Sequence, residues 1–201
     1  KNTKRIFLKM YKNYIKRIID ITLSVSLIII LLPIMIIIFF IVWIRIGFPI
    51  FLQKRPGLNN KIFTLYKFKS LYDADDSVSE KKRQNSIGNF LRKTGLDELP
   101  QLFNVLQNNM SLVGPRPLLI KYLDKYSEHE KQRHLVKPGI TGLAQVVDNP
   151  SGIKFWRKSI KLDIFYASHV SFLLDIKILF RTVKLVILKK KQYDDFKKFY
   201  E

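Results

Sequence analysis

The chain has 201 residues and a formal net charge of +20, from 36 Lys and Arg against 16 Asp and Glu. It contains no cysteine, which excludes disulfide bonds and thiolate metal sites and is typical of a domain in a reducing compartment. So large a positive charge predicts an acidic partner, such as a nucleic acid, an anionic membrane surface or a phosphate-rich substrate.

The first twenty residues carry seven Lys and Arg among aliphatic and aromatic side chains. Helical spacing gathers many of the apolar side chains on one face, with Tyr11 and Tyr14 suited to the level of the lipid headgroups. Asp20 is the only acid in this segment. Because it follows Lys16 by four residues and Arg17 by three, it is predicted to pair with one of them on the helix surface.

Residues 21–44 form a run of 24 residues without a charged side chain. About 20 apolar residues suffice for a helix to cross the hydrocarbon core of a bilayer. The run is too evenly apolar for a core helix of a small domain, and it is too long for a cleaved secretory signal. The sequence therefore predicts a membrane protein, and attraction to anionic lipid explains the net charge better than nucleic-acid binding does.

The route of this segment through the membrane has two interpretations. Pro33 lies near the middle, where it removes a backbone hydrogen bond and kinks a helix. Basic side chains flank both ends, among them Lys16, Arg17, Arg45 and Lys54. Because Lys and Arg collect on the cytoplasmic side, this symmetry favours a segment that enters and leaves by the same face. A straight span with a tolerated proline stays open on these residues alone.

Two β-prone runs follow at residues 49–53 and 61–68, with turn residues between them at 55–60. This pattern predicts a β-hairpin with a long loop. Residues 72–86 are polar and alternate in charge, which indicates an exposed excursion or a short helix.

Two neighbouring carboxylates are the main feature of the next segment. Gly95 can end one helix, and Pro100 is tolerated in the first turn of the following one. Asp97 and Glu98 are then expected at or beside a helix N-terminus, where acidic side chains are favoured. Spacing alone favours a role for both as helix caps.

A rigid turn at residues 114–117, Gly-Pro-Arg-Pro, is expected to hold Arg116 in place. Residues 118–136 have the pattern of a polar helix that is broken by the Pro-Gly pair at 138–139. A loop or a short extended piece is predicted at residues 140–145.

Residues 153–190 show two helical patterns joined near residues 168–171. Their apolar side chains interleave with Lys and Arg, so these helices are expected to pack on a core or to lie in the membrane interface. The three histidines, His129, His134 and His169, lack metal-ligand spacing and are predicted to be surface or packing residues. The sequence has no Gly-rich phosphate loop.

These elements predict an α+β fold, mainly α with a β-hairpin. Residues 1–45 form a basic segment with the membrane helix, and residues 46–201 form one small domain with interfacial amphipathic helices. The second part has about 155 residues, which is enough for one compact domain.

The order of these segments resembles that of the bacterial monotopic phosphoglycosyl transferases, also called polyprenyl-phosphate sugar-1-phosphate transferases. The resemblance covers nearly the whole chain. Its central segments are LDELPQLFNVL at residues 96–106 and MSLVGPRP at residues 110–117. The other matching segments are residues 16–20, 51–57, 66–70, 138–146 and 162–175. One short motif would have little specificity, whereas this series in the family's order is specific.

The resemblance implies transfer of a sugar-1-phosphate from a UDP-sugar to polyprenyl (undecaprenyl) phosphate, with release of UMP, as the first membrane step of glycan assembly. It implies a two-step mechanism through a covalent phospho-sugar aspartate. It also implies a re-entrant helix broken at Pro33 and a catalytic domain that faces the cytoplasm at the bacterial inner membrane. Membrane lipids are expected partners, a homo-oligomer and downstream glycosyltransferases are further candidates, and nucleic acid is not expected.

The resemblance also assigns residues to roles. Asp97 matches the nucleophile, and Glu98 matches the residue associated with Mg²⁺, a cation that prefers carboxylate and phosphate oxygens. The positions that match substrate- or phosphate-binding groups are Arg92, Arg116, Lys67, Asp163, Asp175, Pro115 and Pro117. For Asp163 and Asp175 the alternative is that they hold the arginines in place.

The chain departs from the family's usual pattern at three places. Leu32 precedes Pro33 where members often carry serine, so the helix break depends on the proline alone. Residues 146–150 replace an Asn-Gly-Arg-type stretch, which leaves the sugar unassigned, and the C-terminal tail is divergent. Two competing functions are a membrane-anchored scaffold, in which Asp97 and Glu98 only cap a helix, and a tethered nucleic-acid binder.

Overall fold

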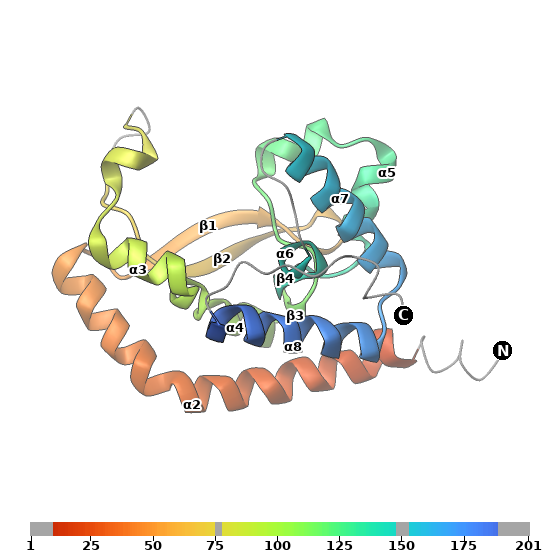
Figure 1. Cartoon of the computed structure of the whole chain (residues 1–201), viewed down its shortest axis with the longest axis horizontal. Coiled ribbons are helices and arrows are strands. Elements are labelled where there is room, and N and C mark those ends of the chain that lie inside the picture. Colours follow the sequence, from red (N-terminus) through yellow and green to blue (C-terminus); the bar gives the residue numbers. More distant parts are fainter. Residues whose placement is uncertain (1–9, 75–77, 148–152, 189–201) are drawn as a thin grey trace.

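The computed structural model describes residues 10–74, 78–147 and 153–188, and this part of the chain is mostly helical with two small sheets (Figure 1). The main elements are α2 (Lys16–Arg45), β1 (Ile50–Pro56), β2 (Ile62–Phe68), α3 (Ser86–Thr94), α4 (Gln101–Leu106), β3 (Ser111–Val113), β4 (Gly139–Thr141), α6 (Leu143–Val146), α7 (Ile153–Ser168) and α8 (Phe172–Leu188). Short helical segments between them are η1 (Tyr11–Ile15), η2 (Leu58–Asn60), η3 (Glu80–Arg83), η4 (Leu96–Glu98), η5 (Ile120–Lys125), α5 (Glu128–Lys131) and η6 (Gln132–Leu135). The sequence interpretations of residues 1–9, of 148–150 and of the tail from 189 lie outside the described residues.

The long apolar helix α2 is bent. Pro33 lies inside it, and a proline that lacks the amide hydrogen and presses on the preceding turn is a recognised cause of such a kink. One arm runs beneath the domain and the other rises beside α3 toward the start of β1 (Figure 1). Within the described ranges, this is the one helix long and apolar enough to cross a membrane, and 17% of its most apolar stretch is buried. A core helix would be mostly buried, so α2 has the exposure of a helix that contacts lipid.

Both arms of α2 pack on the same domain, at two different cores. Before the proline, Ile19 and Ile28 contact the larger core, which includes residues of β2, α4, β3, α6, α7 and α8. After the proline, Val42 belongs to a smaller core with Phe68 of β2 and Leu91 of α3. The bend therefore brings the two halves of one apolar helix against one folded unit.

The predicted hairpin is confirmed. Strands β1 and β2 pair antiparallel from Ile50 opposite Phe68 to Pro56 opposite Ile62, and η2 lies within the connecting loop. Because side chains alternate along a strand, the hairpin has two faces with different roles. One face carries Leu65, which joins the larger core, and the other carries Phe68, which joins the smaller core.

A second, parallel pair of strands holds the centre of the domain, with Ser111 opposite Gly139 and Val113 opposite Thr141. The extended piece predicted after the Pro-Gly pair is therefore a strand. Glycine is needed here because the two backbones approach closely: a Cβ on Gly139 would lie 2.1 Å from the amide nitrogen of Gly114. This contact places the turn after β3 against the turn before β4.

The prediction of one helix over residues 118–136 is wrong. The segment consists of η5, α5 and η6, with extended backbone at Leu119 and Tyr126. Ser127 restarts the helix, since it forms a capping box with Glu130. The two helices predicted at the C-terminal side, by contrast, are confirmed as α7 and α8.

The prediction that Asp20 pairs with Lys16 or Arg17 on the helix surface is also wrong. Asp20 is buried, and its Oδ1 accepts a hydrogen bond of 3.0 Å from the backbone amide of Leu112 in β3. Arg17 turns to the carbonyls of Val105 and Leu106, at 2.6 and 3.0 Å. The basic-acidic segment therefore anchors the first arm of α2 to the domain instead of forming local pairs.

The tyrosines of the first segment have different environments. Tyr11, expected at the headgroup level, is 1% exposed, because its hydroxyl is hydrogen-bonded within the domain to Asp175. Tyr14 is 69% exposed and remains suited to a headgroup contact. Helix α8 carries an exposed apolar stripe at helical spacing, formed by Leu173, Ile176, Phe180 and Val183. That stripe fits the expected interfacial helix.

The hydrogen bond between Asp20 and Leu112 generates a stability prediction. We expect Asp20→Ala to lower the free energy of unfolding by about 1–3 kcal/mol, because it leaves a buried backbone N–H without an acceptor. In a chain of this size the Tm should fall by about 2–4 °C per kcal/mol in thermal denaturation followed by circular dichroism in micelles.

The matched control is Asp20→Asn, which keeps an oxygen acceptor at the same place and should lose less stability than the alanine variant. Equal losses in the two variants would contradict the assignment of this hydrogen bond.

Candidate active site

Asp97 and Glu98 lie in η4, between the end of α3 and the start of α4. Gly95 ends α3 with a left-handed backbone, φ 74°, as the sequence predicted, and turns the chain so that the two acids precede α4. Pro100 is the N-cap residue of α4, and its side chain makes no capping hydrogen bond to the first turn of that helix. Within the described residues, therefore, the capping role of Asp97 and Glu98 favoured by spacing is not observed.

Glu98 is held by two cations. Its Oε1 accepts hydrogen bonds from Lys67 Nζ at 2.7 Å and from Arg116 Nη2 at 2.9 Å. Lys67 comes from β2 and Arg116 from the turn after β3, so three separate elements meet at one carboxylate oxygen. In the described part of the chain both hydrogen bonds fall on Oε1, and Oε2 keeps its lone pairs for another ligand.

Electrostatics separates the two acids. Burial raises the pKa of Asp97, which is 7% exposed, and this effect exceeds the opposing attraction of Lys67. For Glu98, burial also acts to raise the pKa, but Arg116 and Lys67 outweigh it and hold the pKa below its ordinary value. Glu98 is thus a fixed anion, and Asp97 beside it is a poorly solvated and more basic carboxylate.

The turn that carries Arg116 is fixed through its backbone. Three successive carbonyls accept hydrogen bonds from three different partners: Pro115 from the Gly139 amide at 3.0 Å, Arg116 from an Arg133 guanidinium nitrogen at 2.7 Å, and Pro117 from an Arg55 guanidinium nitrogen at 3.2 Å. The side chain of Arg116 stays 48% exposed. The prediction of a rigid turn holding an arginine is therefore confirmed.

Asp163 supports this turn from behind. The guanidinium of Arg133, 1% exposed, donates to Asp163 Oδ2 through Nε at 3.1 Å and Nη2 at 2.7 Å. The same Nη2 holds the carbonyl of Arg116. Asp163 thus holds a buried arginine that positions the backbone of Arg116, which agrees with the alternative role given to it on sequence grounds. Its direct contact with a phosphate stays a prediction.

Asp175 is the centre of a different network. Its carboxylate accepts hydrogen bonds from Tyr11 at 2.6 Å, Lys16 at 2.5 Å and Tyr166 at 2.7 Å. Burial, and then the charge of Asp175, raise the pKa of Tyr166, so that hydroxyl keeps its proton. The same hydroxyl oxygen lies 3.0 Å from the carbonyl oxygen of Val113, one residue before the Gly-Pro-Arg-Pro turn. Asp175 joins the first arm of α2 to β3, and a phosphate-binding role for it stays untested.

Arg92 points away from this cluster in the described structure. It donates to Glu80 Oε1 at 2.6 Å and to Asn89 Oδ1 at 2.8 Å, on the side of α3 that faces η3. Its predicted contact with the transferred phosphate requires a change of these surface pairs. Exposed pairs of this kind contribute about 0–1 kcal/mol, so such a change costs little.

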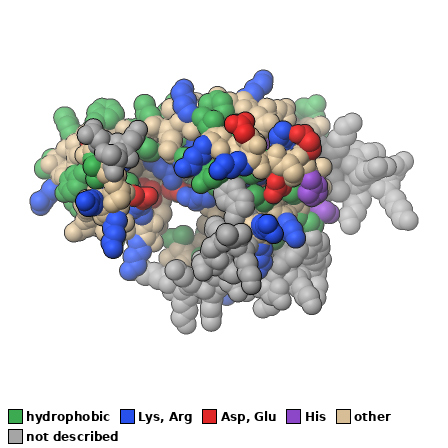
Figure 2. Space-filling view, turned by 90° about the horizontal axis from the view of Figure 1, so that it is seen from above, with side chains coloured by type: hydrophobic (Ala, Val, Ile, Leu, Met, Phe, Trp, Pro, Cys, Tyr) green, Lys and Arg blue, Asp and Glu red, His purple; other side chains and the backbone are tan. Residues whose placement is uncertain are grey.

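Two cavities meet at Glu98. One is a small polar hollow of about 60 Å³ whose lining includes Arg55, Lys67, Arg116 and Pro117. The other is an apolar groove of about 530 Å³ that runs from the first arm of α2 along α8. Lys and Arg side chains are also prominent on the face of the domain opposite the arm of α2 that runs beneath it (Figure 2). The cationic hollow and the apolar groove therefore both border the carboxylate of Glu98.

The donor set fits a magnesium ion that is completed by substrate. Among the described residues no three His, Cys, Asp or Glu side chains are grouped to hold a metal by themselves. Mg²⁺ usually binds to one or two carboxylates together with substrate phosphates and water. Glu98, with Oε2 available and Asp97 adjacent in sequence, provides this kind of site.

Sequence reasoning missed Arg55 and Arg133 as residues of the site. Arg55 lies on the same face of the hairpin as Leu65 and Lys67, so the alternation of side chains in the predicted hairpin was a usable signal. Arg133 gave no comparable signal, because it belongs to a segment predicted as a polar surface helix. Its role depends on the broken path of the chain between η5 and η6.

The comparisons with known proteins agree with this geometry. Residues 11–189 match the family model described as bacterial sugar transferase. The chain is 44% identical over 181 residues to an uncharacterized sugar transferase, EpsL, of Bacillus subtilis, which covers 88% of this chain and 89% of that protein. It is 38% identical to a galactosyl transferase, CpsE, of Streptococcus agalactiae, over 86% of this chain and 42% of that protein. It is 34% identical to an undecaprenyl-phosphate galactose phosphotransferase of Salmonella typhimurium, over 92% of this chain and 43% of that protein.

The chain is thus an enzyme of the phosphoglycosyl transferase class. It belongs to the bacterial sugar transferase family, as the family model and these relatives show. It spans most of the length of the Bacillus relative and less than half the length of the other two.

The buried pair of Asp163 and Arg133 generates a second prediction. We expect Asp163→Asn to destabilise the fold by about 3–5 kcal/mol, because it leaves a buried guanidinium without its counter-charge. Thermal denaturation in detergent micelles measures the loss. Glu128→Gln is the matched control: it removes an exposed partner of Lys131, 2.6 Å away, and should cost less than about 1 kcal/mol. Similar effects of the two substitutions would show that the Arg133 pair does not support the fold.

Proposed function

We propose that this protein transfers a sugar-1-phosphate from a UDP-sugar to polyprenyl phosphate and releases UMP. The observation that carries the proposal is a pair of adjacent carboxylates. Glu98 is held by two cations and lines both a cationic hollow and an apolar groove, and Asp97, its neighbour in the chain, is buried. A relative from Xanthomonas campestris, 39% identical over 160 residues, is named a UDP-glucose:undecaprenyl-phosphate glucose-1-phosphate transferase.

In the first step, a carboxylate oxygen of Asp97 attacks the phosphorus that carries the sugar. A bond forms between this oxygen and phosphorus, and the bond from phosphorus to the bridging oxygen of the diphosphate breaks. UMP leaves with that oxygen and its electron pair, so no proton is consumed. Burial favours this attack, because it removes water from the carboxylate and raises its basicity.

In the second step, a phosphate oxygen of the polyprenyl phosphate attacks the phosphorus of the aspartyl intermediate. The bond between Asp97 and phosphorus breaks, which restores the carboxylate and yields polyprenyl-diphosphate-sugar. Splitting the transfer in two lets both substrates use the same cations in turn. Lys67, Arg55 and Arg116 provide three positive charges where two negatively charged groups must approach each other.

A magnesium ion bound by Glu98 and the donor phosphates would screen charge and polarise the phosphoryl oxygens. The chain's own contribution is to keep Glu98 ionised at all working pH values, since Arg116 and Lys67 hold its pKa low. These two cations also orient the carboxylate from opposite elements, β2 and the turn after β3. Glu98 is therefore the proposed metal ligand.

The apolar groove supports a polyprenyl acceptor. Its lining includes Leu27 and Leu31 of α2, Leu179 and Val183 of α8, and Glu98 at the polar end. A polyprenyl phosphate carries its charge at one end of a long apolar chain, so it can place the chain between α2 and α8 and its phosphate near Glu98. The groove thus matches both parts of the acceptor.

We further propose that α2 is re-entrant and that the domain faces the cytoplasm at the bacterial inner membrane. The support is that Ile19 and Val42, on either side of Pro33, pack on the same domain. A straight span would carry one of these residues across the bilayer and away from its partners. A bent helix keeps both contacts and sets the depth of the catalytic residues.

The scaffold alternative has less support. It requires Asp97 and Glu98 to serve as helix caps, whereas Glu98 is engaged by Lys67 and Arg116.

Membrane lipids remain expected partners. Self-association and contact with downstream glycosyltransferases also remain proposals.

The nucleophile assignment predicts a loss of chemistry without a loss of membrane binding. Asp97→Asn should reduce UMP release from a UDP-sugar by at least about a thousandfold, because the amide cannot form the phosphoryl intermediate. The assay uses undecaprenyl phosphate, Mg²⁺ and a panel of UDP-sugars, with mass spectrometry for the covalent adduct.

Asp124→Asn, at an exposed carboxylate outside the site, is the matched control and should keep wild-type turnover. Undiminished UMP release by Asp97→Asn would contradict the assignment of Asp97 as the nucleophile. If the wild-type protein released no UMP from any of the UDP-sugars, the scaffold function would be favoured.

The topology proposal can be tested with single cysteines, because the chain has none of its own. We expect Lys12→Cys and Asp124→Cys to react with an impermeant maleimide in inverted vesicles and to be protected in intact cells. Adding Pro33→Leu should straighten α2 and shift part of the Lys12→Cys labelling to intact cells. Labelling of the two sites from opposite sides in the wild-type background would exclude a re-entrant helix.

A further inference from the structure

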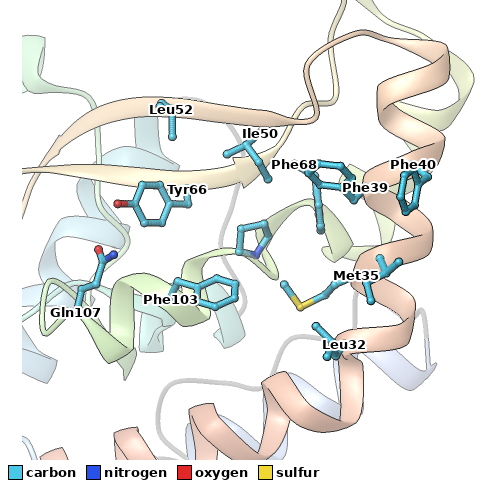
Figure 3. A pocket seen from close by; sticks show the side chains of 12 residues that line it. Leu32, Met35, Phe39, Phe40, Ile50, Leu52, Tyr66, Phe68, Phe103 and Gln107 are labelled. Atoms are coloured by element: carbon cyan, nitrogen blue, oxygen red, sulfur yellow. The ribbon is translucent and has the colours of Figure 1, made fainter.

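A second large apolar pocket lies inside the bend of α2. Its volume is about 500 Å³, within the range of about 300–1,000 Å³ that is usual for ligand pockets. The rising arm of α2 contributes Met35 and Phe39, the hairpin contributes Tyr66 and Phe68, and α4 contributes Phe103 (Figure 3). The catalytic carboxylates are not part of its lining.

The hairpin separates this pocket from the active site. Lys67 projects from one face of β2 toward Glu98, and its neighbours Tyr66 and Phe68 project from the other face into the pocket. A ligand in the pocket therefore lies behind the sheet that carries Lys67.

The pocket face of the hairpin changes in polarity along its length. Cross-strand pairing places Ile50 opposite Phe68, then Leu52 opposite Tyr66, then Lys54 opposite Thr64. The side chains on this face thus run from apolar, through a tyrosine, to an exposed ammonium group. Lys54 Nζ donates to Thr64 Oγ1 at 2.8 Å, which holds it at the end of the apolar row.

The polar atoms of the pocket gather at the same end. In Figure 3 the hydroxyl of Tyr66 points away from α2 and toward the side of Gln107, whereas Leu32 and Met35 close the end at the bend. Several lining side chains are also open to the surroundings: Leu32, Ile36 and Phe40 are each between 46% and 49% exposed. A helix as apolar as α2 has acyl chains as its surroundings.

We propose that this pocket binds one acyl chain of an anionic membrane phospholipid, with Lys54 holding the lipid phosphate. The chain occupies the apolar end between Met35, Phe68 and Phe103, and the headgroup lies beyond Tyr66 at Lys54. The occupant is a bilayer phospholipid and not the acceptor substrate, because the pocket and the catalytic carboxylates lie on opposite faces of the hairpin. The lipid fills the bend of α2 and supports the angle between its arms.

The proposal requires only that α2 is embedded in lipid and does not depend on the transfer mechanism. The full chain is reconstituted in phosphatidylcholine nanodiscs that contain phosphatidylglycerol with a diazirine at the end of one acyl chain. After irradiation, mass spectrometry of the peptides locates the label. We expect it on α2 near Met35 and Phe39 and on α4 near Phe103.

Two substitutions with matched controls test the two halves of the site. Lys54→Glu should reduce labelling about fivefold, the order of effect of one basic side chain on binding at an anionic membrane surface. Lys61→Glu, at the exposed loop of the same hairpin, should leave labelling unchanged. Leu52→Trp should block the pocket, whereas Ile62→Trp, at an exposed position outside it, should not.

Three outcomes would overturn the proposal. One is the absence of label at these residues of α2 and α4. Another is equal labelling of the wild-type protein and of Lys54→Glu, which would contradict the proposed contact between Lys54 and the lipid phosphate. The third is displacement of the label by undecaprenyl phosphate, which would make the pocket an acceptor site. Because Lys54→Glu is a surface change, circular dichroism should show an unchanged fold in that variant.

Discussion

The arrangement of this enzyme depends on one constraint: a single apolar helix packs on the same domain with both of its halves. Ile19 packs against one core and Val42 belongs to another, with Pro33 between them in the helix. Neither half can rotate or slide without breaking a core, so the angle of the helix and the position of the domain are coupled. Polar side chains also fix the orientation of the first half of the helix, because Asp20 and Arg17 form hydrogen bonds to particular backbone atoms of β3 and α4.

Separate elements also meet around Asp97 and Glu98. The residues that touch Glu98 come from β2 and from the turn after β3, and the backbone of that turn is held by Gly139, Arg133 and Arg55. Rigid backbone with a partly exposed arginine side chain is a useful combination. The guanidinium can follow a phosphate that changes position during a reaction, while its attachment point stays fixed.

The sequence predicted local features well because they depend on local chemistry. The hairpin, the glycine end of α3, the two C-terminal helices and the apolar segment all follow from periodicity and turn residues. The residues named by family resemblance include Asp97, Glu98, Lys67 and Arg116, which the fold brings together. Failures occurred where side chains have distant partners: Asp20 and Tyr11 were assigned to the helix surface and the headgroups, yet both bind groups over 90 positions away. Spacing along a chain contains no information on such contacts.

The double pairing of Glu98 has a consequence for how a nucleotide enters. With no ligand bound, Lys67 and Arg116 are both paired with the carboxylate of Glu98, so their charges are partly neutralised within the protein. If the proposed donor binds here, its phosphoryl oxygens compete with Glu98 for hydrogen bonds from Lys67 and Arg116. On the proposed function, any contact that Lys67 or Arg116 makes to the donor therefore competes with its contact to Glu98.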